Sequence, residues 1–338
     1  MLDMGYQPHS ILAIDVTHFS RSLAVLPAMR ALRDAYPKTF IIAAAPSGTC
    51  GFVDSGELAD ETIDLGVVKP GGGDYGGSIK RVFRLMKRAR RDSLDMAIDF
   101  SPRFETQLLL RMMPRGRVIT PSRISQIFES LFERGGRVSR STSHADECAS
   151  ALKRLGIEIE DTRLGIALPE EANEHFEQLL SRHGSRGGEP IVVLYSSKAG
   201  GTRGWPIEHF SETSVRLVGD FGARIVAADE PADNRFTKAI EKLLPKGSIK
   251  LQRPHALELA AAIARASLFI TDDTEITQIG LDFDTPVLEI SDSPQRSSRS
   301  KRHRVVYGAS RVRITPSEIY EVACEMLQEG RTVSLFRR

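Results

Sequence analysis

Two ionisable side chains, Asp15 and His18, lie where the first apolar run of the chain gives way to a polar loop. An imidazole has an ordinary pKa of about 6.5, so His18 is a candidate general base at neutral pH. His18 could instead cap the helix that follows or face solvent. Asp15 is the second candidate base, and at a strand end it could also fix the loop by accepting hydrogen bonds.

Two concentrated basic segments could bind anions. The first, residues 78–91, holds seven basic residues and no acidic one, including Lys80, Arg84 and Lys87. It could be a solvated surface helix, or it could dock on anionic lipid headgroups or a phosphorylated acceptor. The second, residues 296–304, could act similarly or bind a diphosphate. Neither segment interleaves exposed aromatic side chains, so we expect no nucleic-acid partner.

Short apolar runs alternate with helical patterns along the whole chain. After the first run, Ile11 to Val16, apolar residues at helical spacing continue until Pro37. Further strand-like runs occur at 40–44, 61–65, 95–100, 117–120, 191–195, 223–227, 248–251, 268–271 and 287–290. This alternation predicts an α/β protein whose two halves each contain a parallel sheet.

A segment rich in Pro and Gly, from Leu164 to Pro190, separates the two halves. We place the boundary near residue 168, between an N-terminal domain 1–168 and a C-terminal domain 169–338, whose last helix could pack back on the first domain. Ligands of open α/β sheets bind beyond the carboxyl ends of the strands, so we expect two facing domains with the working cleft between them.

Composition excludes several classes of protein. The chain has 338 residues, of which 41% are hydrophobic and 27% charged, which excludes disordered and collagen-like proteins. The 46 basic and 44 acidic residues give a net charge of +2 and no global attraction to nucleic acid. No apolar run approaches the roughly 20 residues that cross a bilayer, and the start lacks a secretory signal. We therefore expect a cytoplasmic protein, peripheral at the inner membrane face if residues 78–91 bind lipid.

Two patterns that suggest cofactors are better explained as structural. The glycines Gly71, Gly73 and Gly76 match the dinucleotide-binding spacing, but they follow Pro70 rather than a clean strand, so we interpret them as a flexible loop. The three cysteines are far apart and form no CxxC pair, so we expect neither a metal site nor a disulfide framework.

Five segments together, in this order, resemble one known family: VLPAMRALRDAYP at 25–37, LDMAIDFSPR at 94–103, HADECASALKRLGI at 144–157, RGWPIEHFSE at 203–212 and LELAAAIARASLFITDDTEITQIGLDFDTPVL at 257–288. The family is the ADP-heptose:lipopolysaccharide heptosyltransferases, also called glycosyltransferase family nine. Within the fourth segment we interpret Trp205 and Pro206 as a packed anchor at a helix start.

The resemblance implies a GT-B fold, with two Rossmann-like domains facing a central cleft. The first domain would hold an anionic glycan or glycolipid acceptor and the second a nucleotide-sugar, ADP-linked in this family. The implied reaction is transfer to a cell-envelope glycan or lipopolysaccharide-type acceptor, with inversion at the anomeric carbon, no metal and no further cofactor.

The resemblance also implies which residues would bind each substrate. Hydroxyls, small residues and cations in the loop after Tyr195 would hold the diphosphate. The expected nucleotide-sugar-binding residues are Ser196, Ser197, Lys198, Thr202, Arg203, Asp233, Asp273, Thr274 and Gln278. The expected acceptor-side residues are Arg21, Lys80, Arg84 and Lys87.

The chain departs from the family at the residues that do the chemistry. Arg21 stands where the family has the aspartate expected to be its general base, and a guanidinium cannot accept a proton. Glu275 and Gln278 replace the glycine and the histidine of the family's D-[ST]-G-x-x-H motif. A carboxylate at residue 275 would repel a diphosphate unless nearby cations neutralise it. These changes leave open an alternative function, a catalytically silent module that binds nucleotide-sugar or acts as a scaffold.

Overall fold

The computed structural model describes residues 7–66, 94–103, 106–107, 110, 117–121, 143–185, 187–197, 204–231, 233–293 and 300–335, with side chains described up to residue 330. The glycines at 71–76, the basic segment 78–91 and residues 198–203 lie outside these ranges. The chain divides into two compact units, Met1–Gly165 and Ile166–Arg338, whereas we placed the boundary near residue 168.

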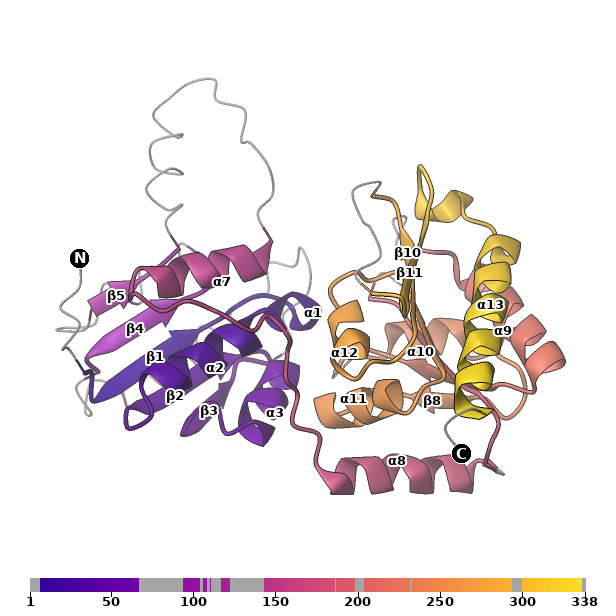
Figure 1. Cartoon of the computed structure of the whole chain (residues 1–338), viewed down its shortest axis with the longest axis horizontal. Helices are drawn as coiled ribbons and strands as arrows, with labels where there is room; N and C mark the ends of the chain where they lie inside the picture. Colours follow the sequence, from indigo (N-terminus) through magenta and orange to yellow (C-terminus); the bar gives the residue numbers. More distant parts are fainter. Residues whose placement is uncertain are drawn as a thin grey trace. The chain divides into compact units, whose positions relative to one another are not determined.

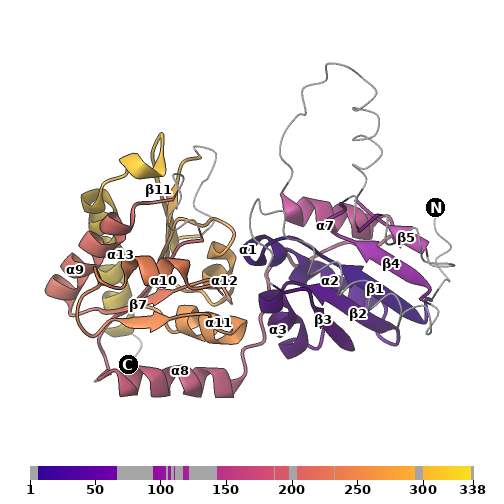
Figure 2. The ribbon, with the colours of Figure 1, turned by 180° about the vertical axis from the view of Figure 1, so that it is seen from behind.

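The first unit is built on a parallel sheet whose described strands have the order β3-β2-β1-β4-β5 (Figure 1). The strands are β1 (Ser10–Ile14), β2 (Phe40–Ala45), β3 (Glu61–Asp64), β4 (Met96–Asp99) and β5 (Arg117–Ile119). The described helices are α1 (Phe19–Ser22), α2 (Val25–Ala35), α3 (Ser47–Ser55) and α7 (His144–Lys153). Helices α2 and α7 pack side by side (Figures 1 and 2).

The central strand of this sheet, β1, is an uninterrupted apolar run because both of its faces are covered. Ile11 and Ile14 are fully buried, and β1 pairs in parallel with β2 on one side and β4 on the other. Helix α2 contributes an apolar stripe at helical spacing, in which Met29 and Leu32 are buried. The alternation read from the sequence therefore corresponds to real β-loop-α units.

The second unit contains a parallel sheet whose described strands have the order β11-β10-β9-β6-β7-β8. The strands are β6 (Ile191–Tyr195), β7 (Arg224–Ala228), β8 (Ile249–Leu251), β9 (Leu268–Thr271), β10 (Val287–Ser291) and β11 (His303–Tyr307). The helices are α8 (Glu170–Arg182), α9 (Ile207–Phe221), α10 (Arg235–Ile240), α11 (Ala256–Ala264), α12 (Thr277–Asp282) and α13 (Pro316–Leu335), with a 3-10 turn at Arg311–Arg313.

Alternate residues of these strands enter two apolar layers. One layer joins Val192 and Leu194 of β6 with buried side chains of α9, α10 and α13. The last helix, α13, which we expected could reach the first domain, packs here against α9 of its own unit (Figure 2).

No helix in the described part of the chain is long and apolar enough to cross a membrane.

Trp205 anchors the start of α9, as we interpreted from the sequence. Its side chain is buried, its backbone N–H donates to Asp272 Oδ2 at 2.8 Å, and its indole N–H donates to the carbonyl of Ile314 at 2.9 Å. The indole also meets the ring of Phe210 edge to face, with the centroids 4.6 Å apart. Pro206 is the N-cap residue of α9.

Strand β11 is missing from the sequence-based prediction because the basic segment 296–304 runs into it. His303 is buried and lies 3.0 Å from Glu289, and Arg304 pairs with Glu325 and Glu329 of α13. His303 and Arg304 of this segment therefore belong to an edge strand, where both side chains have partners within the fold, while residues 294–299 lie outside the described ranges.

Each sheet has a point where the order of its strands reverses. In the first sheet the chain moves outward from β1 to β2 and β3, and later to β4 and β5 on the other side. In the second sheet the same change occurs between β6 and β9. Connections leave such a pair of strands in opposite directions, so a crevice opens at their carboxyl ends, where ligands of open α/β sheets bind.

Candidate functional site

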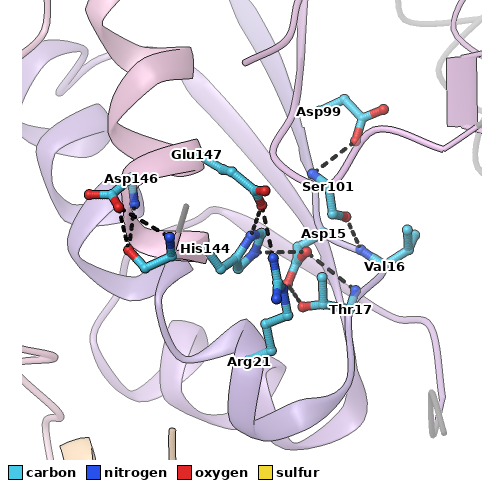
Figure 3. A network of polar contacts seen from close by, with 10 residues as sticks. Asp15, Val16, Thr17, Arg21, Asp99, Ser101, His144, Asp146 and Glu147 are labelled. Atoms are coloured by element: carbon cyan, nitrogen blue, oxygen red, sulfur yellow. Dashed lines mark hydrogen bonds and ion pairs between the residues drawn. The ribbon is translucent and has the colours of Figure 1, made fainter. Parts of the chain in front are cut away.

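The carboxyl ends of β1 and β4 bring Asp15, Asp99 and Ser101 together at the reversal point of the first sheet (Figure 3). Asp15 directly follows β1 and is 1% exposed. It accepts hydrogen bonds from the backbone N–H of Thr17 at 3.3 Å and from the Thr17 hydroxyl at 2.7 Å. Ser101 crosses to the same loop, where its Oγ accepts from the N–H of Val16 at 2.7 Å. Asp15 therefore fixes its loop, one of the two roles considered from the sequence.

The start of helix α7 supplies two further ionisable residues, His144 and Glu147. Ser143 is the N-cap, and with Asp146 it forms a reciprocal capping box that fixes the first turn. His144 and Glu147 are three positions apart, so they lie on one face of the helix. The sequence contains this signal as Ser-x-x-Asp before a helical pattern, but it does not reveal what the helix start faces.

These residues join Asp15 and Arg21 in one chain of ion pairs (Figure 3). His144 Nε2 lies 3.3 Å from Asp15 Oδ1, and both side chains are almost completely buried. His144 Nδ1 lies 2.9 Å from Glu147 Oε2. The same Glu147 oxygen accepts from a guanidinium nitrogen of Arg21 at 3.2 Å. Glu147 and Arg21 keep 29% and 35% of their side chains exposed, so the chain runs from the core to the surface.

The ion pairs set the protonation states of the cluster. Burial disfavours charge on Asp15, but the contacts with His144, together with the bonds from Ser22 and Thr17, outweigh it and lower the pKa of Asp15. Burial also disfavours charge on His144, but its carboxylate neighbours raise the pKa of the imidazole well above its ordinary value. The cluster at neutral pH therefore alternates two carboxylates with an imidazolium and a guanidinium.

Asp99 lies beside this cluster, and its pKa is shifted upward, whereas that of Asp15 is shifted downward. Burial raises the pKa of Asp99 to about 6, and the charge of Asp15 adds to that shift. The hydrogen bonds from Thr106, Gln107 and the backbone of Ser101 oppose it. One reversal point thus holds a carboxylate that stays ionised and another that titrates close to neutrality.

The reversal point of the second sheet brings Ser196 and Asp273 to neighbouring strand ends. Ser196 follows β6 and Asp273 lies two residues beyond β9, and the last residues of these strands, Tyr195 and Thr271, are in register. Asp273 is 5% exposed, and its Oδ1 accepts from the N–H of Glu275 at 2.9 Å. Ser197 lies in the same loop as Ser196, at the edge of the described range.

Thr274 is hydrogen-bonded to the buried pair of Glu289 and His303, which the sequence did not indicate. Its hydroxyl donates to Glu289 Oε1 at 2.6 Å, and Glu289 Oε2 lies 3.0 Å from His303 Nε2. Because the hydroxyl hydrogen is engaged, Thr274 in this arrangement can accept a hydrogen bond from a sugar hydroxyl but cannot donate one to a phosphate.

Asp233 lies in the loop between β7 and α10, and Gln278 lies on α12. The Oδ1 atom of Asp233 accepts from the backbone N–H of Asn234 and Arg235, and its Oδ2 pairs with the Arg235 side chain at 2.6 Å. Gln278 is half-buried in the first turn of α12, three residues after the half-buried Glu275.

Some of the expected site residues lie close together in the structure, and others are not among the described residues. Asp15 and Arg21 belong to one ion-pair chain, and the half-buried His18 caps the nearby helix α1 without a side-chain cap bond. Lys80, Arg84, Lys87, Lys198, Thr202 and Arg203 lie outside the described residues. Sequence reasoning missed His144, Glu147, Asp99 and the Glu289–His303 pair. Among the described residues, no group of three or more His, Cys, Asp or Glu could hold a metal ion.

Comparison with solved structures identifies the fold. A family 9 glycosyltransferase from Veillonella parvula superposes with a TM-score of 0.71 at 18% identity, covering 97% of this chain and 99% of that one. The E. coli ADP-heptose lipopolysaccharide heptosyltransferase II gives a TM-score of 0.66 at 16% identity, covering 95% and 99%. The chain has the GT-B fold.

The same fold also carries other chemistry. The UDP-GlcNAc 2-epimerase from Neisseria meningitidis superposes with a TM-score of 0.54 at 10% identity, covering 94% of this chain and 91% of that one. No protein-family model and no curated protein sequence matches the chain. At these identities the likeness establishes the fold, and function has to be argued from the sites.

Proposed function

We propose that the protein is an inverting, metal-independent glycosyltransferase that moves a sugar from a nucleotide-sugar to a cell-envelope glycan or lipopolysaccharide-type acceptor. The observation that carries the proposal is the ionised, partly exposed cluster at the reversal point of the first sheet, on a fold shared with heptosyltransferases. A transferase of this kind needs a proton acceptor on one substrate side and a diphosphate site on the other.

The donor would bind at the reversal point of the second sheet. Ser196 and Asp273 lie there at adjacent strand ends, as expected for a nucleotide in an open α/β sheet. Ser197, Lys198, Thr202 and Arg203 follow Ser196 in the sequence and would supply hydroxyls and cations for the diphosphate. An ADP-linked donor is proposed because the similar E. coli enzyme is named for ADP-heptose.

The acceptor would bind at the first unit. Arg21 keeps about a third of its side chain exposed and can contact an anionic glycan or glycolipid. Lys80, Arg84 and Lys87 would extend this cationic surface and could hold the protein at the inner face of a membrane, as a peripheral cytoplasmic enzyme.

The alternative is a catalytically silent module that binds nucleotide-sugar or acts as a scaffold. The half-buried Glu275 and Gln278, which depart from the family motif, favour it. Turnover separates the two functions, because a silent module can bind a nucleotide-sugar without releasing nucleoside diphosphate from it.

Thermal-shift titration with ADP-, UDP- and GDP-linked sugars tests the donor site. A ligand at a hundred times its Kd stabilises the folded state by about 2.7 kcal/mol, so the Tm should rise with the preferred nucleotide. Asp273→Asn should reduce that rise, whereas Asp161→Asn, at an exposed position of the first unit, should leave it unchanged. A folded protein whose Tm responds to none of these nucleotides would contradict the proposal.

A further inference from the structure

The exposed end of the ion-pair chain carries a carboxylate oxygen that is not committed to the fold. Both contacts of Glu147, with His144 Nδ1 and with Arg21, are made by Oε2. Oε1 has no hydrogen bond or ion pair with any residue that the structure describes. The Glu147 side chain that ends in this oxygen is 29% exposed.

The other carboxylates of this reversal point are less suited to meet a substrate. Asp15 is 1% exposed, and its two oxygens are occupied by Thr17 and by His144. Asp99 is fully buried and accepts from Ser101, Thr106 and Gln107. Glu147 thus combines a fixed position, an uncommitted oxygen and access from solvent.

From this geometry we propose that Glu147 is the general base of the transfer reaction, and that Asp15 acts through His144 as a positioning residue. The proposal rests on the proposed glycosyltransferase function. Asp15 holds the imidazolium, the imidazolium and Arg21 hold Oε2, and Oε1 faces the acceptor.

The step balances with these groups alone. The acceptor hydroxyl gives its proton to Glu147 Oε1 while its oxygen forms a bond to the anomeric carbon of the donor. The bond from that carbon to the phosphate oxygen breaks, and its electron pair leaves with the nucleoside diphosphate. Glu147 then returns the proton to water. Arg21 and His144 keep their protons throughout. Their positive charges compensate the Glu147 carboxylate before it accepts the proton and again after it has released the proton to water.

The electrostatics are consistent with a base that is ionised before the acceptor binds. Burial works against ionisation of Glu147, but the hydrogen bond with His144 and the charge of Arg21 outweigh it and lower the pKa of Glu147. Removing Arg21 should therefore raise that pKa and move the acid limb of the rate profile to higher pH.

The test compares Glu147→Gln and Glu147→Asp with a matched control, Glu171→Gln, which makes the same change at an exposed position in the first turn of α8. The measurement is release of nucleoside diphosphate from an ADP-linked sugar, in water and with a glycan acceptor. Glu147→Gln should lower the turnover number about 10²–10⁴-fold and leave the thermal shift with ADP unchanged. Glu147→Asp should keep part of the activity, and Glu171→Gln all of it.

Turnover by Glu147→Gln within a few-fold of the unmodified protein would overturn the base assignment and leave the proposed function standing. An unmodified protein that turns over no donor would overturn both. If Glu147→Gln does not fold, the pH-rate profile of Arg21→Gln provides the test. An acid limb displaced to higher pH supports Glu147 as the base, and an acid limb at the same pH as in the unmodified protein contradicts it.

Discussion

At the scale of single residues, two carboxylates at one strand junction have opposite tendencies because their partners differ. Asp15 faces an imidazolium that favours its charge, whereas the described hydrogen-bond donors to Asp99 are neutral and the negative charge of Asp15 opposes its ionisation. Desolvation is therefore overcome at Asp15 and prevails at Asp99. Both aspartates are visible in the sequence at strand ends, but their protonation depends on His144, which lies far along the chain.

Asp99 should make the protein less stable as the pH rises from about 4 to about 6. Its pKa is 3.8 in an unperturbed chain and about 6 in the fold, so the folded state binds the extra proton in this window. Stability from this group is fully present below the lower value and is lost as the pH passes the upper one. The loss amounts to about 3 kcal/mol.

Asp99→Asn cannot titrate and should remove this slope, even if lost hydrogen bonds lower its stability at every pH. Urea denaturation of both proteins at about pH 4 and about pH 7 gives the two slopes. Equal slopes for Asp99→Asn and the unmodified protein would show that Asp99 does not titrate in this window.

At the scale of elements, apolar runs were sufficient to find strands that are buried on both faces. The strands from β1 to β10 are within a few residues of the predicted runs. For central strands such as β1 and β6 the reason is that a parallel sheet covered by helices requires continuous apolar segments, whereas β3 and β5 are only partly buried. Strand β11 escaped prediction because it is an edge strand whose His303 and Arg304 are polar and find partners from β10 and α13. An ion-pair partner that lies on another strand or helix leaves no pattern in the sequence around the residue that it contacts.

Gly280 shows how tightly one helix meets the second sheet. A Cβ at this position would lie 2.5 Å from Val287 Cγ2 and 3.3 Å from Phe269 Cδ1, and both neighbours are fully buried. Gly280→Ala should therefore lower the free energy of unfolding by about 1–3 kcal/mol through overpacking.

Gly219, on the exposed face of α9, is the matched control. An added Cβ there meets no described atom within 4 Å, so Gly219→Ala should raise the free energy of unfolding by about 0.5–1 kcal/mol through helix propensity. Chemical denaturation of both variants checks the pair. A Gly280→Ala variant as stable as Gly219→Ala would mean that α12 can move away from the sheet without cost.

At the scale of the whole molecule, the sequence was sufficient for the fold and insufficient for the site. Alternating elements and five segments similar to one family predicted the GT-B architecture that the solved structures confirm. The ion-pair chain joins Arg21 to Glu147 across 126 positions, and only the folded sheet places them together. The capping-box pattern in the sequence predicts where α7 begins, but it does not predict that the first turn of α7 faces the end of β1.

Sugar transfer by the intact protein is the most direct test of the proposed glycosyltransferase function. ADP-, UDP- and GDP-linked sugars are incubated with a lipopolysaccharide-type acceptor, and nucleoside diphosphate and glycosylated product are quantified together. Both should form in equal amounts with one donor class, and Glu147→Gln should form neither at a comparable rate. A folded protein that binds nucleotide yet yields neither product would contradict it and favour the silent module.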